Sequence, residues 1–352
     1  MSVLNLIRPE LKNTIVTSQS ESDTLTNRLH ANELPWCPLP ADTGAFNHYP
    51  DVRKQNLLQE QLARRYQVKS EQILVTRGSD DGIDALMRLF LSAGKNSILQ
   101  CPPTFSLYAF YAQLQNAAVI NCPLDESQGF GLSLKDLFNA WQPGCNIIML
   151  CQPNNPTGNL LTLENIAEIC DAFTNKAVVI VDEAYIEFAK INSATTLLSD
   201  FENLIILRTL SKAYGLAGLR IGSIIAQEPI ITALQKTRAP YLLSSPVLDL
   251  ALVALTDNDW FTTKTRQVLS ARDQLISDLQ KSPWIASIYP SHANFLLIKS
   301  PYAHALAHWF SCHDIAIRRF PNDGALKDTM RITVGSEAQN ITLLNVLETF
   351  KG

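Results

Sequence analysis

The sequence predicts an α/β fold, in which a mostly parallel seven-stranded sheet lies between helices and a smaller α+β domain follows it. Short apolar runs alternate with helical patterns from about residue 70, which is typical of parallel sheets covered on both faces. Two runs, residues 147–150 and 178–181, are apolar throughout, as expected of strands buried on both faces. The predicted strands are residues 72–76, 96–100, 118–122, 146–151, 177–182, 203–207 and 221–226.

A change of pattern near Asn258 predicts a domain boundary. A long helical pattern is followed there by shorter strands, which favours an α+β arrangement. We therefore predict an N-terminal arm (1–40), a large α/β domain (41–257) and a small α+β domain (258–352). Helices are predicted over residues 80–91, 104–114, 163–173 and 211–216 of the large domain and 260–280 and 337–350 of the small one, whose strands are 285–289, 294–299, 315–318 and 331–334.

The composition narrows the possible partners and location. A formal net charge of −4 over 352 residues argues against a nucleic-acid partner. No apolar run reaches the ~18 residues of a membrane span, and the N-terminus lacks the pattern of a secretory signal. Seven scattered cysteines without a Cys-x-x-Cys pair predict neither disulfides nor zinc, and favour the cytoplasm. His304 and His308 lie four residues apart without a third ligand nearby, so no metal site is expected.

The most informative segment, residues 208–222, places Lys212 in a short Ser/Thr-rich loop after a predicted strand. Nearby cations lower the pKa of a lysine and make its amine nucleophilic, as a lysine that forms a Schiff base requires. Thr209, Ser211 and Arg220 supply hydroxyl groups and a second cation that suit a phosphate. The alternative is a basic helix start with Ser211 as its N-cap.

Two further motifs follow predicted strands, where the ligands of parallel sheets bind. Asp182 and Tyr185 lie in the segment Asp182-Glu-Ala-Tyr185, and a carboxylate at the end of a buried strand requires a cation. Asn155 lies in Gln152-Pro-Asn-Asn-Pro-Thr-Gly158, where two prolines and a glycine restrict the loop. A structural ion pair and an ordinary Asn-Pro turn are the respective alternatives.

Two weaker signals lie earlier in the chain. Gly78 permits a tight turn after the first strand, and the amides of Ser79 and Asp80 at the next helix start suit a phosphate. A capped strand–helix junction explains this segment equally well. Tyr108, in the helix after the second strand, is placed to stack on a planar ligand, although an aromatic residue there is more often part of the core.

Together these motifs resemble the fold-type I, class II pyridoxal-phosphate-dependent aminotransferases, and most of all the histidinol-phosphate aminotransferases. The resemblance runs in the family's motif order from His30 to the C-terminus. It implies that the large domain binds pyridoxal 5′-phosphate and that Lys212, Asp182 and Tyr185 are catalytic. The implied cofactor ligands are Ser79, Asp80, Tyr108, Asn155, Asp182, Tyr185, Thr209, Ser211, Lys212 and Arg220, together with Tyr49 contributed across the interface of a homodimer.

The resemblance also implies substrate-binding residues. Arg331 would hold a carboxylate by its planar guanidinium. Arg318, or the adjacent Arg319, would lie near the substrate phosphate, and Asn32 of the arm would lie over the site. The arm departs from the family's pattern, because the first 48 residues contain no tyrosine where relatives carry one that faces the substrate.

The implied reaction transfers the amino group of histidinol phosphate, a phosphorylated amino alcohol, to 2-oxoglutarate, which gives imidazole acetol phosphate and glutamate in histidine biosynthesis. Two enzymes of the same fold are alternatives, an aromatic amino-acid aminotransferase and a threonine-phosphate decarboxylase. A third alternative, from a different functional class, is a catalytically inactive binding protein that has kept the fold. The intact set of motif residues argues against that last alternative.

Overall fold

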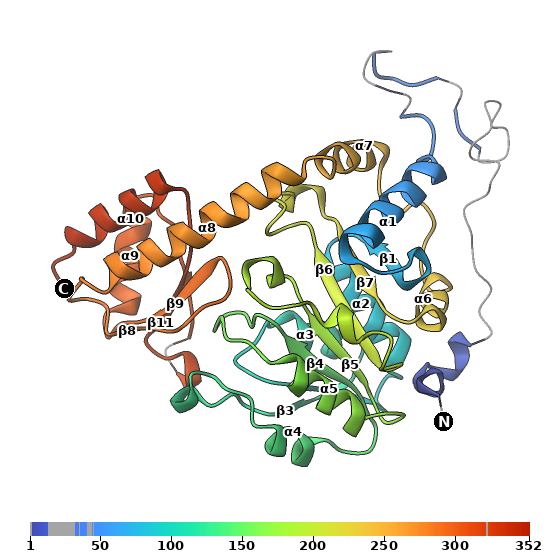
Figure 1. Cartoon of the computed structure of the whole chain (residues 1–352), viewed down its shortest axis with the longest axis horizontal. Coiled ribbons are helices and arrows are strands. Elements are labelled where there is room, and N and C mark those ends of the chain that lie inside the picture. Colours follow the sequence, from blue (N-terminus) through green and yellow to red (C-terminus); the bar gives the residue numbers. More distant parts are fainter. Residues whose placement is uncertain (1, 13–31, 35, 41–43, 45, 322) are drawn as a thin grey trace.

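The chain folds around two β-sheets, a seven-stranded one and a four-stranded one (Figure 1). We describe it from a computed structural model, which covers residues 2–12, 32–34, 36–40, 44, 46–321 and 323–352. Most of the predicted arm, including residues 13–31, therefore lies outside the described residues. Near the N-terminus, the short 3-10 helix Val3–Leu6 is described, and Val3 and Ile7 pack into the core beside the large sheet.

The large sheet has the strand order β1-β7-β6-β5-β4-β2-β3. Its strands from β2 to β6 pair in parallel, whereas β7 runs antiparallel to both β1 and β6. The predicted mostly parallel sheet is therefore confirmed, with no strand boundary more than two residues from its predicted position. The strands are β1 (Ile73–Thr76), β2 (Ser97–Gln100), β3 (Ala118–Asn121), β4 (Cys145–Cys151), β5 (Val178–Asp182), β6 (Leu204–Thr209) and β7 (Gly222–Ile225).

Helices cover both faces of this sheet, because its central strands are apolar on both sides. Along β4, for example, Ile147 belongs to one core and Ile148 to the other. One face packs against α2 (Ser79–Phe90), α3 (Leu107–Leu114) and α6 (Glu228–Gln235). The other face packs against α1 (Val52–Tyr66), α4 (Leu134–Ala140), α5 (Leu163–Ala172) and α7 (Ser245–Ala254).

The helix predicted over residues 211–216 is wrong. The amide of Ser211 donates to Thr209 Oγ1 at 3.1 Å, and the amide of Gly215 donates to the carbonyl of Lys212 at 3.1 Å, so the segment forms turns. Gly215 has a φ of 68°, which ends any helical path. The segment therefore presents Lys212 on a loop rather than on a helix.

The four-stranded sheet has the order β10-β11-β9-β8 and is antiparallel throughout. Its strands are β8 (Ser287–Ile288), β9 (Phe295–Lys299), β10 (Arg318–Arg319) and β11 (Thr329–Thr333). Helices α8 (Asn258–Leu279), α9 (Ala303–Cys312) and α10 (Glu337–Glu348) share its core. In Figure 1, α8 runs as one long helix from beside α7 to this sheet. It begins at the residue where we placed the domain boundary, which stays a prediction.

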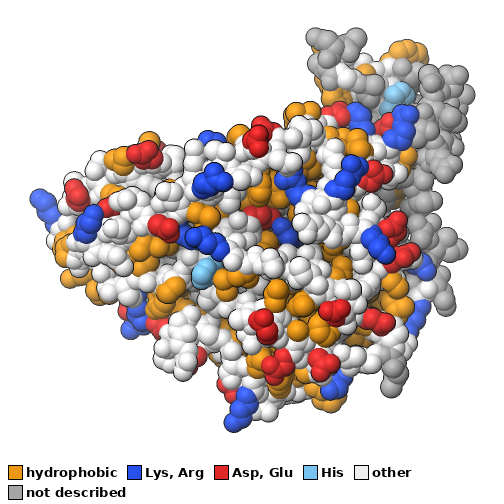
Figure 2. All heavy atoms as spheres, in the orientation of Figure 1, with side chains coloured by type: hydrophobic (Ala, Val, Ile, Leu, Met, Phe, Trp, Pro, Cys, Tyr) orange, Lys and Arg blue, Asp and Glu red, His pale blue; other side chains and the backbone are white. Residues whose placement is uncertain are grey.

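On the face shown in Figure 2, acidic and basic side chains are interspersed rather than gathered into a basic stripe. Within the described part of the chain, no helix combines the length and the apolar composition that a membrane crossing requires.

Candidate active site

Lys212 lies in the loop after β6, close to side chains from the carboxyl ends of the neighbouring strands. Its Nζ is 5.5 Å from the centre of the Tyr185 ring. The residue is accessible to solvent. The pKa of Lys212 is lowered from its usual 10.5, first by the partial burial of the amine and then by the charge of Arg331. A larger fraction of the amine is therefore neutral and nucleophilic than in a free lysine.

Asp182 ends β5 as a buried carboxylate, only 3% exposed. It accepts hydrogen bonds from Tyr108 Oη at 2.7 Å and from the amide of Ala184 at 3.1 Å. Burial nevertheless raises the pKa of Asp182 from 3.8 to about 6, because these two donors do not replace its hydration. A buried carboxylate of this kind suits a cationic ligand that would restore its charge.

Asn155, Tyr185 and Arg331 form a connected group beside Lys212. Asn155 Nδ2 donates to Tyr185 Oη at 3.4 Å, and Arg331 Nη1 donates to Asn155 Oδ1. Phe295 packs edge-on against Tyr185, with ring centres 5.1 Å apart, and lies under the guanidinium of Arg331. Burial raises the pKa of Tyr185. The phenol therefore keeps its proton and remains a hydrogen-bond donor at neutral pH.

Arg220 closes the other side of the site beside the start of α2. Its Nη1 donates to Ser211 Oγ at 3.2 Å, and its Nη2 lies 3.2 Å from Asp80 Oδ2. The N-cap of α2 is Gly78, which offers no capping side chain. The first amides of α2, including that of Ser79, therefore meet a guanidinium and a hydroxyl, as in an anion-binding site.

Thr209 is buried and bonded within its own loop. Its hydroxyl donates to the carbonyl of Ile221 at 3.2 Å and accepts from the amide of Ser211. This geometry holds Ser211 beside Arg220. The structure therefore gives Thr209 a direct part in shaping the loop that carries Lys212.

The register of the small sheet distinguishes Arg318 from Arg319. Arg318 lies directly opposite Arg331 across the β10–β11 pair, so their side chains share one face of the sheet. Arg319 lies opposite Met330, which is fully buried in the small sheet's core. Burial, and to a smaller extent the charge of Arg318, lower the pKa of Arg331. The nearby hydroxyl of Tyr185 partly opposes this shift.

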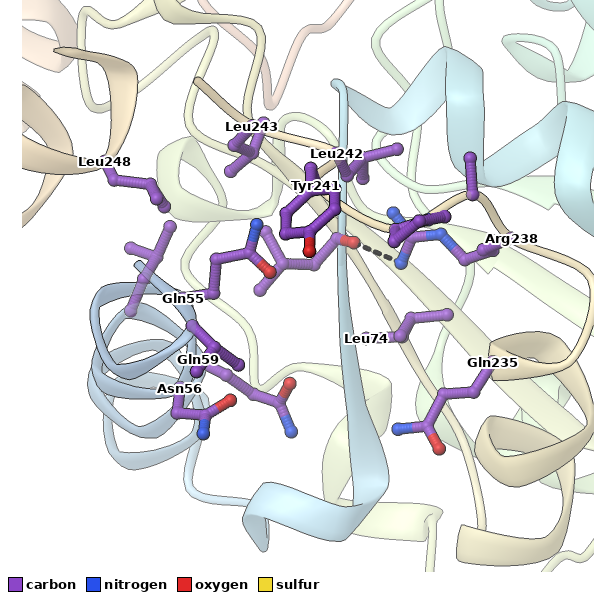
Figure 3. Close-up of a pocket in the computed structure, with 15 residues that line it drawn as sticks. Gln55, Asn56, Gln59, Leu74, Gln235, Arg238, Tyr241, Leu242, Leu243 and Leu248 are labelled. Carbon is purple, nitrogen blue, oxygen red and sulfur yellow. Dashed lines mark hydrogen bonds between the residues drawn. The ribbon is translucent and has the colours of Figure 1, made fainter. Parts of the chain in front are cut away.

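The structure does not bring Tyr49 or Asn32 into this group of residues. Tyr49 is 49% exposed and stacks on Tyr241 at a centroid distance of 4.4 Å. Tyr241 borders a cavity of about 340 Å³ between α1 and the segment before α7, where Arg238 donates to the carbonyl of Val75 (Figure 3). No residue predicted for the site lines this cavity. Asn32 is exposed and makes no hydrogen bond to a described residue of the site.

Two contributors to the site were not predicted. Asn154 joins two of its loops, since its Nδ2 donates to the carbonyl of Pro103 at 2.9 Å and its Oδ1 accepts from Thr104 Oγ1 at 2.8 Å. The Asn-Asn pair is the sequence signal that could have identified it. Gly222 is the second, because β7 passes against the start of α2 there: a Cβ at this position would lie 2.4 Å from the backbone carbon of Gly78.

We expect Gly222→Ala to push the first turn of α2 away from Arg220. A Cβ at this position would also lie 2.5 Å from the amide nitrogen of Ser79, and backbone atoms cannot turn aside as a flexible side chain can. Overpacking of this kind costs about 1–3 kcal/mol. The unfolding temperature of the cofactor-free protein should therefore fall. The affinity of the protein for pyridoxal phosphate, measured by titration, should weaken.

Gly218 of the same loop provides the matched control, because a Cβ there meets nothing within 4 Å. Gly218→Ala should leave both measurements unchanged. Equal behaviour of the two variants would contradict the proposed tight contact between β7 and α2.

Comparison with known proteins identifies the family of this chain. Residues 16–347 match the family described as aminotransferase class I and II. Histidinol-phosphate aminotransferase 1 of Legionella pneumophila (strain Lens) is 50% identical over 353 residues, which cover 99% of this chain and 96% of the relative. Histidinol-phosphate aminotransferase of Xylella fastidiosa (strain 9a5c) is 38% identical, covering 98% and 96%.

Among solved structures, histidinol-phosphate aminotransferase from Sinorhizobium meliloti, in complex with pyridoxal-5′-phosphate, aligns with a TM-score of 0.79. It is 25% identical and the alignment covers 91% of this chain and 90% of that one. The structure from Clostridium acetobutylicum, another histidinol-phosphate aminotransferase, has the same fold with a TM-score of 0.78 at 23% identity, covering 86% and 90%. The family inferred from the motifs is confirmed: this chain belongs to the class I and II aminotransferases.

Proposed function

We propose that this protein is a pyridoxal-phosphate-dependent aminotransferase that transfers the amino group of L-histidinol phosphate to 2-oxoglutarate. The observation that carries this proposal is the pair Arg318 and Arg331, which lie opposite each other on one face of the small sheet, with Arg331 close enough to Lys212 to lower its pKa. Two guanidinium groups on one face suit the dianionic phosphate of the substrate, and one of them suits the carboxylate of glutamate. The 50% identity to a histidinol-phosphate aminotransferase over nearly the whole chain supports the same substrate.

The donor set fits pyridoxal 5′-phosphate at three points. Arg220, Ser211 and the uncapped start of α2 would bind its phosphate. Asp182 would pair with its pyridine nitrogen. This pairing would explain why a carboxylate is buried here with too few hydrogen-bond donors to replace its hydration. A bulkier residue at Gly78 would fill the phosphate position, since a Cβ there lies 2.5 Å from Arg220 Nη2.

Two more residues complete the proposed cofactor site. Asn155 and Tyr185, which are bonded to each other, would donate to the oxygen on the pyridine ring. The family resemblance implies that Tyr108 stacks on that ring. Its side chain is fully buried and its hydroxyl bonds to Asp182, which supports a part in orienting this carboxylate.

The chemistry follows from the protonation states of these groups. When bound, pyridoxal phosphate accepts the electrons left on the substrate α-carbon. Asp182 would keep a proton on the pyridine nitrogen, and Tyr185 keeps its own proton because its pKa is raised. Lys212, whose pKa is lowered, would take the proton from the substrate α-carbon and would return one at C4′ of the cofactor.

Arginine variants test the proposed substrate contacts. Arg318→Ala should raise KM for histidinol phosphate about 10- to 100-fold, because one charge-assisted hydrogen bond contributes about 1.5–3 kcal/mol. The KM for 2-oxoglutarate should change much less. Arg331→Ala should raise both values. Steady-state kinetics with each substrate varied in turn separates these effects.

Arg319→Ala is the control for this comparison, since Arg319 lies on the opposite face of β10. It should behave as the wild type. A larger effect of Arg319→Ala than of Arg318→Ala would reverse the assignment drawn from the strand register.

The function itself is tested by following products with three candidate substrates. The purified enzyme, supplied with pyridoxal phosphate and 2-oxoglutarate, should form glutamate faster from histidinol phosphate than from phenylalanine. Faster glutamate formation from phenylalanine would assign the chain to the aromatic aminotransferases. Release of carbon dioxide from threonine phosphate would identify a decarboxylase.

We also propose that the active enzyme is a homodimer to which Tyr49 contributes across the interface. In support, Tyr49 lies outside the site of its own chain and is half exposed. Sedimentation velocity of the holoenzyme tests the assembly, and a monomer with full activity would contradict it. Cytoplasmic location stays a prediction from the sequence, as does the part of Asn32 above the site.

A further inference from the structure

A buried cluster of charged residues lies directly behind the strand ends that carry the site. Arg208 Nη2 donates to Glu187 Oε1 at 2.8 Å, and its Nη1 lies 3.3 Å from Glu183 Oε2. The side chains of Arg208, Glu183 and Glu187 are 8%, 0% and 6% exposed. We call these three residues the Arg208 cluster.

Each member of the Arg208 cluster is a close chain neighbour of a proposed catalytic residue. The first glutamate follows Asp182 directly, and the second comes two residues after Tyr185. The arginine comes four residues before Lys212, at the end of the adjacent parallel strand. The cluster therefore joins the two chain segments, 182–187 and 208–212, whose side chains must converge on one ligand.

The cluster is built more elaborately than packing alone requires. Glu183 also accepts from Ser193 Oγ at 2.5 Å and from the amide of Ala194 at 2.7 Å, and Tyr66 lies under the guanidinium at 4.4 Å. Two carboxylates share one guanidinium, and Glu187 Oε2 and Arg208 Nε have no hydrogen-bond partner among the described residues. Apolar side chains of similar volume often stabilise a fold at least as well as such buried ions. Hydrogen bonds between charged groups, by contrast, have a preferred direction and fix the relative positions of the segments that they join more strictly than apolar packing does.

The cluster and the catalytic carboxylate lie on opposite faces of the large sheet. Tyr66, which stacks on Arg208, belongs to the core on the α1 side, whereas Tyr108, which bonds to Asp182, belongs to the core on the α2 side. The cluster is thus separated from Asp182 by the sheet, whereas Tyr185 belongs to the same core as Tyr66. An effect of the cluster on Asp182 must therefore pass through the positions of the two strand ends.

We propose that Arg208, Glu183 and Glu187 are positioning residues that fix the ends of β5 and β6 relative to each other. Their hydrogen bonds fix the two segments that carry Asp182, Tyr185 and Lys212, so that these three side chains meet at one site. This inference rests on the proposed function, because it assigns the cluster to the geometry of that same site.

Substitutions at two of the three residues test the proposal. Glu187→Gln keeps the shape and leaves Arg208 paired with Glu183, so it should fold. Arg208→Met removes the cation, and Arg208→Lys should restore part of the wild-type behaviour. The control is Ile166→Val, in α5 on the same face of the sheet, which removes one buried methyl group outside the Arg208 cluster.

The readouts are chosen so that loss of stability alone does not mimic a positioning effect. In the holoenzyme, the pH midpoint of the absorbance band of the Lys212-bound cofactor should shift by at least about half a unit in Glu187→Gln. The kcat should fall about tenfold while KM stays within about threefold, since small displacements of reacting groups mainly lower the chemical rate. Ile166→Val should lower only the unfolding temperature. A folded Glu187→Gln variant with the wild-type midpoint and kcat overturns the proposal.

A second measurement does not depend on the cofactor. In the cofactor-free protein, amide hydrogen exchange over residues 209–216 should accelerate in Glu187→Gln more than in Ile166→Val. Unchanged exchange there overturns the positioning role even if the wild-type protein binds no pyridoxal phosphate. Failure of the wild type to form the cofactor band contradicts the proposed function instead, so the two failures are distinguishable.

Discussion

Lys212→Ala is expected to lower turnover on the order of 10⁴-fold or more, because one side chain supplies both the nucleophile and the proton-transfer group. Its neighbours leave no replacement, since Asp182 is engaged with Tyr108, and Tyr185 keeps its proton. The protein should still fold, because Lys212 is accessible and its loss opens no cavity in the core. Single-turnover kinetics with histidinol phosphate measures the loss.

Two controls accompany this variant. Lys212→Arg retains a positive charge but not a titratable amine, and it should be as inactive as Lys212→Ala. Lys176→Ala removes an exposed lysine whose Nζ donates to the carbonyl of Ala172, and it should keep full activity. Activity of Lys212→Ala within tenfold of the wild type would remove this residue from the mechanism.

Asp182→Asn is expected to produce two opposite effects. Turnover should fall about 10²–10³-fold, since a fixed negative charge opposite the cofactor ring stabilises the charge that develops there. The cofactor-free protein should become more stable above neutral pH. The wild-type folded protein binds a proton at Asp182 more tightly than the unfolded chain does, because the pKa is about 6 rather than 3.8.

The sign of the pH dependence follows from that difference. A group whose folded pKa is raised loses its stabilising contribution as pH increases, so the wild type loses up to about 3 kcal/mol between pH 4 and pH 7. Asparagine does not ionise and avoids this loss. The stability advantage of Asp182→Asn, measured by denaturant unfolding of the cofactor-free protein, should therefore grow between pH 5 and pH 8. An advantage that shrinks over this range would contradict a raised pKa at Asp182.

The large sheet could be predicted because its strands are buried on both faces, which leaves uninterrupted apolar runs such as β5. Several helices of the large domain were not predicted. Most of the α7 sequence is apolar, so it shows little contrast between its faces, and it was not predicted. Helices α1, α4 and α6 were also not predicted. The false helix at 211–216 shows that a polar loop held by Thr209 and interrupted by Gly215 imitates a helix start.

Parts of the site could be predicted wherever a single segment carried the signal, as with Lys212 or Asp182. Features that depend on pairing between distant segments could not. The choice of Arg318 over Arg319 depends on the β10–β11 register, and the tight contact of Gly222 with α2 depends on where β7 enters the sheet. The Arg208 cluster joins a residue of β6 to two residues of the segment after β5, 25 and 21 positions away along the chain. Spacing along the chain gives no indication of such contacts.

The central claim is that Lys212 lies in a site that binds pyridoxal phosphate and exchanges an amino group with histidinol phosphate. An absorbance titration of the purified holoenzyme under single-turnover conditions tests it most directly. We predict that histidinol phosphate rapidly removes the absorbance band of the lysine-bound cofactor and that 2-oxoglutarate restores it. A band that histidinol phosphate leaves unchanged, or one that 2-oxoglutarate does not restore, would contradict the assignment.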